Sequence, residues 1–536
     1  MAGGRRGQRG GSTLPVNLDR RVAACSLGGL LTLVTAAGAS PTVRHRWASV
    51  AHLTARSLTL ARHGSKALAP SALASLLAGV HRDDPELALM EDFLPNDPRS
   101  VVLARRGDRL VRLFPGSVER PVADVERADM VAAAIDGFLI PRLGFGVRDY
   151  VDLGLLYLDY AIGCLSPAWP DGRDDSTDLS ATPRISEAEY AAAADLALQP
   201  LPPIITDSAA RAAALRFATS SADALPYKPS DPNSVFDQYF AVSLPAAAWP
   251  DLPAESGGGR LWWLPPAFLP DALGYGVTVL AREAAGDSGC AQRFARLAAG
   301  RARRALWRFG SLLGPDDDES GPVASPGNVV QWVSRFGQAR ALLVQLVAGL
   351  SADRMLDEEP AAFRIVREAR DGHGPVRIPM PGGVLTIDSR TELIPLLVYA
   401  SAGHVTTMQF PGAAAMSLDD LTWAAQTAEA DSDLFMFCRE LAAPDRPEIF
   451  GWETINVWEW WRSNGKTLFG GGIAPHAMHI EPHAGNAEWK RAGEHASLER
   501  ALLATGLPPA SAFDVVERTA SGPPTIYAWG DPGEAA

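Results

Sequence analysis

The pattern of apolar residues changes near Gly372, and this change limits the folds that the chain can adopt. Before Gly372, apolar side chains recur at helical intervals along most of the sequence. After it, proline, glycine and β-branched residues become more frequent, and short strand-like runs appear at Val376–Met380, Val384–Asp388 and Leu393–Tyr399. We therefore predict a mainly α-helical, multidomain protein that ends in a smaller mixed α/β or α+β domain.

Helical periodicity predicts most of the elements before the change. The expected helices are Val43–Leu60, Ser71–Val80, Val122–Leu139, Val147–Leu165, Ser186–Leu198, Asp207–Ala222, Asp271–Ala285, Ala291–Phe309 and Asn328–Leu350. Glycine-containing turns predict two β-hairpins, Ser100–Leu103 with Arg109–Phe114 and Val376–Met380 with Val384–Asp388. Farther on, Ser417 and Asp420 form the pattern of a capping box for a helix over Ser417–Ala428. The apolar run Leu434–Cys438 fits either a strand or a helix.

The chain has 536 residues, enough for about three or four domains. Residues 167–184 are polar, acidic and proline-containing, which is typical of a linker. We expect a disordered basic tail over 1–16, a helical domain over 17–166 that carries a short hairpin within 100–114, and a linker over 167–184. A second helical domain over 185–370 and the mixed domain over 371–536 would follow.

The net charge of −13 is unevenly distributed. Residues 1–63 contain nine arginines and one acid, Asp19, a net charge of +8, so the rest of the chain carries −21 (−13 minus 8). An acidic body argues against broad nonspecific binding of nucleic acid. The expected partner is a protein that the sequence does not identify, and the sequence leaves the oligomeric state open.

The segment Val22–Ala39 decides between a cytoplasmic and an exported protein. Its 18 uncharged residues follow Arg20-Arg21 and end in small residues, which is the pattern of an export signal within residues 20–39. Several glycine, serine and threonine residues interrupt the apolar stretch, and positive charge follows it at Arg44 and Arg46. We favour an ordinary helix with Asn17 as N-cap and Gly38 as C-cap, a cytoplasmic protein and no stable membrane span. The four widely spaced cysteines, which suggest no disulfide framework or zinc ribbon, agree with a reducing compartment.

Three short motifs resemble catalytic patterns but are incomplete. Gly286–Gly289 (GDSG) lies between two predicted helices, where a turn is expected. Gly465–Thr467 (GKT) lacks the glycine that a phosphate-binding loop needs five positions before it. Asp388 and Glu392 resemble the paired carboxylates of a metal-dependent nuclease, but Ile394 stands where the lysine of such a site would be.

Two clusters are candidates for contact with a partner. A basic, amphipathic helix over Gln292–Phe309 could dock nucleic acid, anionic lipid or an acidic partner, or it could be a solvated face neutralised by the acidic residues Asp316–Glu319. Its arginines are Arg293, Arg296, Arg301, Arg303, Arg304 and Arg308. Tryptophans that belong either to the core or to an exposed patch are Trp452, Trp458, Trp460 and Trp461.

The strongest chemical pattern is a group of imidazoles and a carboxylate, His476, His479, Glu481 and His483. In an extended backbone, His479, Glu481 and His483 would share one face, and two imidazoles with a carboxylate can bind a divalent metal. The alternative is an irregular loop in which these residues have no common role. No cofactor is predicted, and a divalent metal is the one alternative.

Two functional hypotheses follow. The first is a noncatalytic binding or regulatory protein that uses the tryptophan cluster and the basic helix as contacts. The second is a metal-dependent hydrolase acting on phosphodiesters, nuclease-like, with His479 and His483 as metal ligands, Glu481 as ligand or general base and His476 as an accessory ligand. The sequence does not decide whether the protein is an enzyme.

Overall fold

A computed structural model describes part of the chain. The described residues are 18–40, 47–61, 64–83, 102–106, 109–112, 120–168, 184–198, 205, 207–221, 239–244, 260–313, 329–336, 340–351, 363, 366, 375–380, 383–388, 390–402, 412–442, 458, 461–462, 478–482, 513–517 and 525–528.

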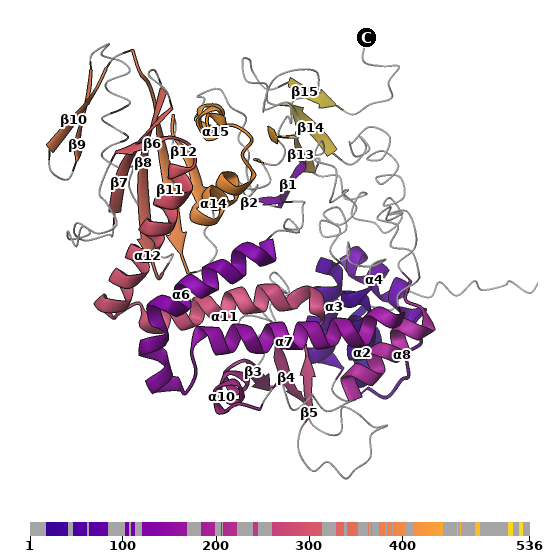
Figure 1. Ribbon diagram of the computed structural model, residues 1–536. Coiled ribbons are helices and arrows are strands. Elements are labelled where there is room, and N and C mark those ends of the chain that lie inside the picture. The colour runs from indigo at the N-terminus through magenta and orange to yellow at the C-terminus, as the bar shows by residue number, and fades with distance from the viewer. Residues whose placement is uncertain are drawn as a thin grey trace, which may run out of the picture.

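The N-terminal helices form one packed group (Figure 1). They are α1 (Leu18–Ala24), α2 (Leu27–Ala39), α3 (Trp47–Leu60) and α4 (Ala72–Asp83). The single helix expected to run unbroken through Val22–Ala39 is wrong, because the chain breaks at Cys25 and Ser26. The Ser26 hydroxyl accepts a hydrogen bond from the Gly29 N–H and caps α2, and Ser40, not Gly38, is its C-cap. Nearly every α2 side chain is buried, which is typical of a core helix.

Four long helices make up the centre of the molecule. They are α6 (Arg120–Leu143), α7 (Val147–Leu165), α11 (Leu269–Ala284) and α12 (Ser288–Trp307). Gly144, with φ of 79°, makes the turn from α6 to α7, a left-handed conformation that glycine adopts without steric cost. Both α6 and α7 contact α11, and α6 also contacts α12, so helices from either side of residues 167–184 share one core. The division of the chain into domains stays a prediction.

Smaller elements surround α7. The helices α8 (Glu187–Leu198) and α10 (Ala209–Phe217) pack against it, as does the 3-10 helix η2 (Ser166–Ala168). A three-stranded sheet has the order β3-β4-β5, and a second 3-10 helix, η5 (Pro266–Phe268), leads from it into α11. The strands of this sheet are β3 (Thr219–Ser221), β4 (Ala241–Leu244) and β5 (Arg260–Trp263).

A five-stranded mixed sheet has the order β12-β11-β8-β7-β6. Its strands are β6 (Ser311–Leu313), β7 (Val329–Phe336), β8 (Arg340–Gly349), β11 (Glu392–Ser401) and β12 (Ala414–Ser417). The strands β8, β11 and β12 run parallel, and β6, β7 and β8 are antiparallel neighbours. The helix expected over Asn328–Leu350 is therefore wrong. Residues Ala341–Ala348 are buried on both faces of the sheet. All of them except Gln345 are apolar, so the alternation of apolar and polar residues that marks a half-exposed strand is lost.

Helices cover one face of this sheet. The helix α12 contacts β6, β7 and β8, whereas α14 (Leu418–Thr427) and α15 (Asp433–Leu441) contact β11 and β12. The expected capping box of α14 is confirmed, since Ser417 and Asp420 exchange hydrogen bonds of 3.0 Å between side chain and backbone N–H. The run Leu434–Cys438 forms a helix. Its Phe437 and Cys438 are buried, and burial raises the pKa of the Cys438 thiol.

Both expected hairpins are confirmed. The strands β9 (Val376–Met380) and β10 (Gly383–Ile387) pair antiparallel, as do β1 (Val102–Arg106) and β2 (Arg109–Arg112). The β1–β2 hairpin belongs to a sheet of order β15-β14-β13-β1-β2, in which β1 pairs in parallel with β13 (Met478–Pro482). The remaining strands of that sheet are β14 (Phe513–Glu517) and β15 (Thr525–Ala528).

The described residues are mostly helical, with small mixed sheets, so the expected mainly α class is confirmed. Strands begin well before Gly372, however, and the largest sheet starts at Ser311. In the described ranges, no single helix is both long and apolar enough to cross a membrane. One sharply bent pair, Glu126–Leu143 with Val147–Ala168, passes that test by length and composition alone.

Candidate anion-binding surface on α12

The helix α12 begins at an N-cap that its sequence supplies. The Asp287 carboxylate accepts a hydrogen bond of 2.8 Å from the Cys290 N–H, and this bond lowers the pKa of Asp287. The turn expected at Gly286–Gly289 is confirmed in its first half: Gly286 lies in the turn after α11, Asp287 is the N-cap of α12, and Ser288 and Gly289 already belong to α12. The N-cap supplies an acceptor for one of the N–H groups that a helix start leaves unpaired.

Two faces of α12 have opposite character. The buried face packs against α6, α14 and the five-stranded sheet through Cys290, Phe294, Ala295, Ala298, Ala302, Ala305 and Leu306. The exposed face carries Arg293, Arg296, Leu297, Arg304 and Trp307, followed by Arg308 at the C-cap. The helix has no acidic residue, so positive charge on its exposed face is not offset within the helix.

The end of α12 forms a small hollow lined by Arg303, Arg304, Trp307 and Arg308, with a volume of about 360 Å³. The Trp307 side chain is 65% exposed. The guanidinium of Arg303 lies over its ring, 5.5 Å from the centroid, in a cation–π arrangement. An exposed indole beside three guanidinium groups offers both an aromatic surface and positive charge.

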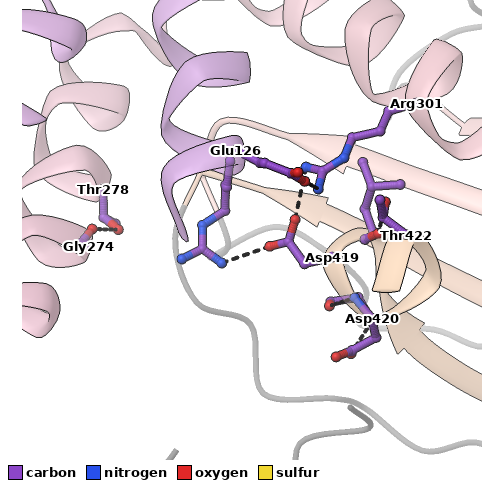
Figure 2. Close-up of polar contacts among 10 residues, drawn as sticks. Glu126, Gly274, Thr278, Arg301, Asp419, Asp420 and Thr422 are labelled. Carbon is purple, nitrogen blue, oxygen red and sulfur yellow. Dashed lines mark hydrogen bonds and ion pairs between the residues drawn. The ribbon is translucent and has the colours of Figure 1, made fainter. Parts of the chain in front are cut away.

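Arg301 has a different environment. Its guanidinium donates to Asp419 at 3.0 Å and to Glu126 at 2.6 Å, and only 12% of the side chain is exposed (Figure 2). Asp419 also accepts from Arg127 at 3.0 Å. These ion pairs join α12 to α6 and α14, so Arg301 is engaged within the molecule and is not part of the exposed surface.

Two further arginines are held by neighbours while staying exposed. Arg293 donates to the Ala134 carbonyl at 3.0 Å and to the Cys290 sulfur at 3.2 Å. Arg308 donates to the Asp431 carboxylate at 2.6 Å, and 44% of its side chain remains exposed. Of the six arginines that the sequence grouped together, the structure gathers Arg303, Arg304 and Arg308 around Trp307.

The two described tryptophans of the predicted patch lie in the core and not on the surface. Trp458 is 1% exposed and Trp461 is fully buried. The Trp458 indole N–H donates to the Thr427 hydroxyl at 2.8 Å, and both rings contact Phe437. This pair packs into the core beside α14 and α15, so its side chains offer no surface to a partner. Trp452 and Trp460 lie outside the described residues.

The predicted metal-binding group is only partly within the described residues. His479 and Glu481 are two positions apart on β13, which has the extended backbone that the hypothesis requires. His476 and His483 lie outside the described residues, as do the acidic residues Asp316–Glu319 and the GKT motif at Gly465–Thr467. Among the described residues, those of β13 included, no three histidine, cysteine, aspartate or glutamate residues are grouped so as to hold a metal. The metal site at β13 stays a prediction.

The predicted pair of nuclease-like carboxylates is a turn between strands. Asp388 and Glu392 are exposed, at the end of β10 and the start of β11. The Asp388 carboxylate accepts from the Arg390 N–H at 3.0 Å, and its carbonyl accepts from the Thr391 N–H at 2.9 Å. These bonds stabilise the turn.

The contact residues predicted for the basic helix were its arginines alone, and they did not include Trp307, whose side chain is exposed. Helical spacing carries a signal for it, since Arg293, Arg296, Arg304 and Trp307 recur at intervals of three, eight and three residues, which keeps them on one side of a helix. The ion-pair partners of Arg301 had no such signal, because Glu126 and Asp419 are far from it in the sequence.

Comparison of the chain with protein-family models, with curated proteins and with solved structures gave no match.

Proposed function

We propose that this is a noncatalytic binding protein that recognises an anionic partner through the exposed side of α12. The contact surface, called here the α12 patch, consists of Arg296, Arg303, Arg304, Trp307 and Arg308. The observation that carries the proposal is the 65% exposure of Trp307 within a hollow that arginine side chains line. Tryptophan and arginine, together with tyrosine, are enriched among the residues that dominate binding energy at interfaces.

The chemistry of the patch favours binding over catalysis. Its members are guanidinium groups and an indole. Guanidinium groups stay protonated and donate hydrogen bonds in a planar fork that matches carboxylates and phosphates. The indole has no group that accepts or releases a proton near neutral pH. Such a set can hold an anion but offers no general base or nucleophile.

The support beneath the patch favours a pre-formed surface. The opposite face of α12 is packed into the core, Asp287 caps its start, and Arg301 ties its middle to α6 and α14. A side chain presented on a rigid element loses less conformational freedom on binding than one on a mobile loop. The patch therefore needs little reorganisation to bind.

A charge-reversal experiment tests this function. The full chain is titrated against three fluorescent probes: a poly-glutamate peptide, a short oligothymidylate and vesicles containing phosphatidylserine. The test variant is Arg296→Glu/Arg304→Glu. The control variant is Arg20→Glu/Arg216→Glu, which makes the same charge change at two exposed arginines outside α12.

We expect at least one probe to bind, with an affinity that falls as salt is added, because ion pairing at an exposed surface is screened. The test variant should bind that probe about tenfold or more weakly, since a reversed charge replaces attraction by repulsion. The control variant should stay within about twofold of the parent. Equal weakening in both variants, or no binding of any probe, would overturn the proposed function.

A further inference from the structure

We infer that the partner of the α12 patch is a single-stranded nucleic acid, with a base stacked on Trp307 and its phosphates paired with Arg304 and Arg308. This inference rests on the proposed function and narrows it to one partner. A single strand combines the two features that the patch offers to match, a planar aromatic surface and closely spaced negative charges.

The indole is placed for stacking. With 65% of Trp307 exposed, an approaching ring can reach it without displacing the core. The Arg303 guanidinium over the Trp307 ring adds a cation to the same surface. The hollow of about 360 Å³ around Trp307 is large enough for one small planar group, because pockets for small ligands begin at about 300 Å³. A protein that binds single strands uses an aromatic side chain together with positive charge in this way.

The arginines follow the helix away from Trp307. Arg296 and Arg304 are eight residues apart on the same helix, which corresponds to about 12 Å along its axis. Arg308 lies one residue beyond Trp307 and keeps 44% of its side chain exposed while it donates to Asp431. Positive charge thus extends past the hollow on one side of α12, so that more than one phosphate of a strand can be paired.

The surroundings of α12 disfavour the alternatives. A membrane surface would need the apolar face of the helix, but Phe294, Ala298 and Leu306 are committed to the core. A long duplex would bring many phosphates near an acidic protein of net charge −13, whereas a short strand meets the local positive charge alone. An acidic peptide would pair with the arginines and leave the exposed indole without a role.

The test compares strands that differ only in their bases. Fluorescein-labelled oligothymidylate and an abasic strand of the same length are titrated against the full chain, with anisotropy as the readout. Thymidine monophosphate and poly-glutamate serve as competitors. The variants are Trp307→Leu, which removes the aromatic ring, and Trp307→Phe, which keeps one. Because Trp307 is on the surface, both variants should fold, and circular dichroism checks this.

We expect the parent to bind oligothymidylate at least about fivefold more tightly than the abasic strand, since stacking on an aromatic side chain contributes at least that factor. Trp307→Leu should abolish the preference, and Trp307→Phe should keep most of it. Equal binding of both strands by the parent overturns the stacking inference, even where Arg296→Glu/Arg304→Glu still shows that the patch binds anions. If poly-glutamate is the one competitor that displaces the strand, the partner is a protein. If thymidine monophosphate binds tightly, the partner is a free nucleotide. Either result overturns the inference.

Discussion

The Asp419 carboxylate lies 3.0 Å from the Arg301 guanidinium and equally near that of Arg127, which joins three helices at one point (Figure 2). Each of the three side chains is only 12 to 13% exposed. The residues are 118 and 292 positions from Asp419 in the sequence, so this contact exists only in the folded chain.

Asp419→Asn should destabilise the fold by about 2 to 4 kcal/mol, because it leaves two poorly solvated guanidinium groups without their shared counter-charge. Urea unfolding followed by circular dichroism measures the change. Arg148→Gln is the matched control, since it removes an ion pair with Asp129 whose partners are 65% and 59% exposed, where the loss should stay below about 1 kcal/mol. Equal losses in the two variants would contradict a structural role for Asp419.

Truncation of two tryptophans should change the stability of the fold by very different amounts. Trp458→Ala should cost about 3 to 5 kcal/mol, because it empties a buried site that packs against Phe437 and removes the hydrogen bond to Thr427. Trp307→Ala should change stability by about 0.5 kcal/mol or less, because its side chain is largely in solvent. Thermal unfolding of both variants and of the parent measures these changes. A large loss of stability in Trp307→Ala would mean that the indole is covered.

Asp136 should make the stability depend on pH in the direction opposite to that of a salt-bridged acid. Burial raises its pKa above the usual value, although the Val147 and Arg148 N–H groups that donate to it act against this. An acid with a raised folded pKa binds its proton more tightly in the folded state. The contribution of Asp136 to the stability of the fold is therefore fully present below its unfolded pKa of about 3.9. That contribution is lost as the pH rises through its pKa in the folded state.

The variant Asp136→Asn tests this sign, since an amide oxygen can still accept from the Val147 N–H, which now donates to the Asp136 carboxylate at 2.7 Å. The thermal midpoint of the variant minus that of the parent should be larger at neutral pH than at acid pH. Asp129→Asn, at an exposed position, serves as the control. A difference between variant and parent that is constant across the range would contradict the assignment.

The metal hypothesis at β13 has a direct measurement. If His479, Glu481 and His483 bind a divalent metal, purified untagged protein should contain it near one ion per chain, and His479→Ala/His483→Ala should lose it while staying folded. Elemental analysis of parent and variant gives the answer. Negligible metal in both would remove the hydrolase hypothesis and leave binding as the function to pursue.

The sequence predicted elements best where local rules are sufficient. The helix Val147–Leu165 has the predicted bounds, and Ser417 and Asp420 form the predicted capping box, because periodicity and caps are set by neighbours within a few residues. Local rules failed at β8, where burial on both faces removed the alternation that distinguishes a strand from a helix.

For the α12 patch, the sequence by itself determined that a basic helix would be present, since its arginines, its lack of acids and its N-cap are all local features. Only the tertiary structure decided what each arginine does. It buried Arg301 between Asp419 and Glu126, left Trp307 in solvent beside Arg303, and placed Trp458 and Trp461 in the core. The physical reason is that burial and ion pairing depend on which distant segments pack against a helix, whereas helix formation depends mainly on the residues within it.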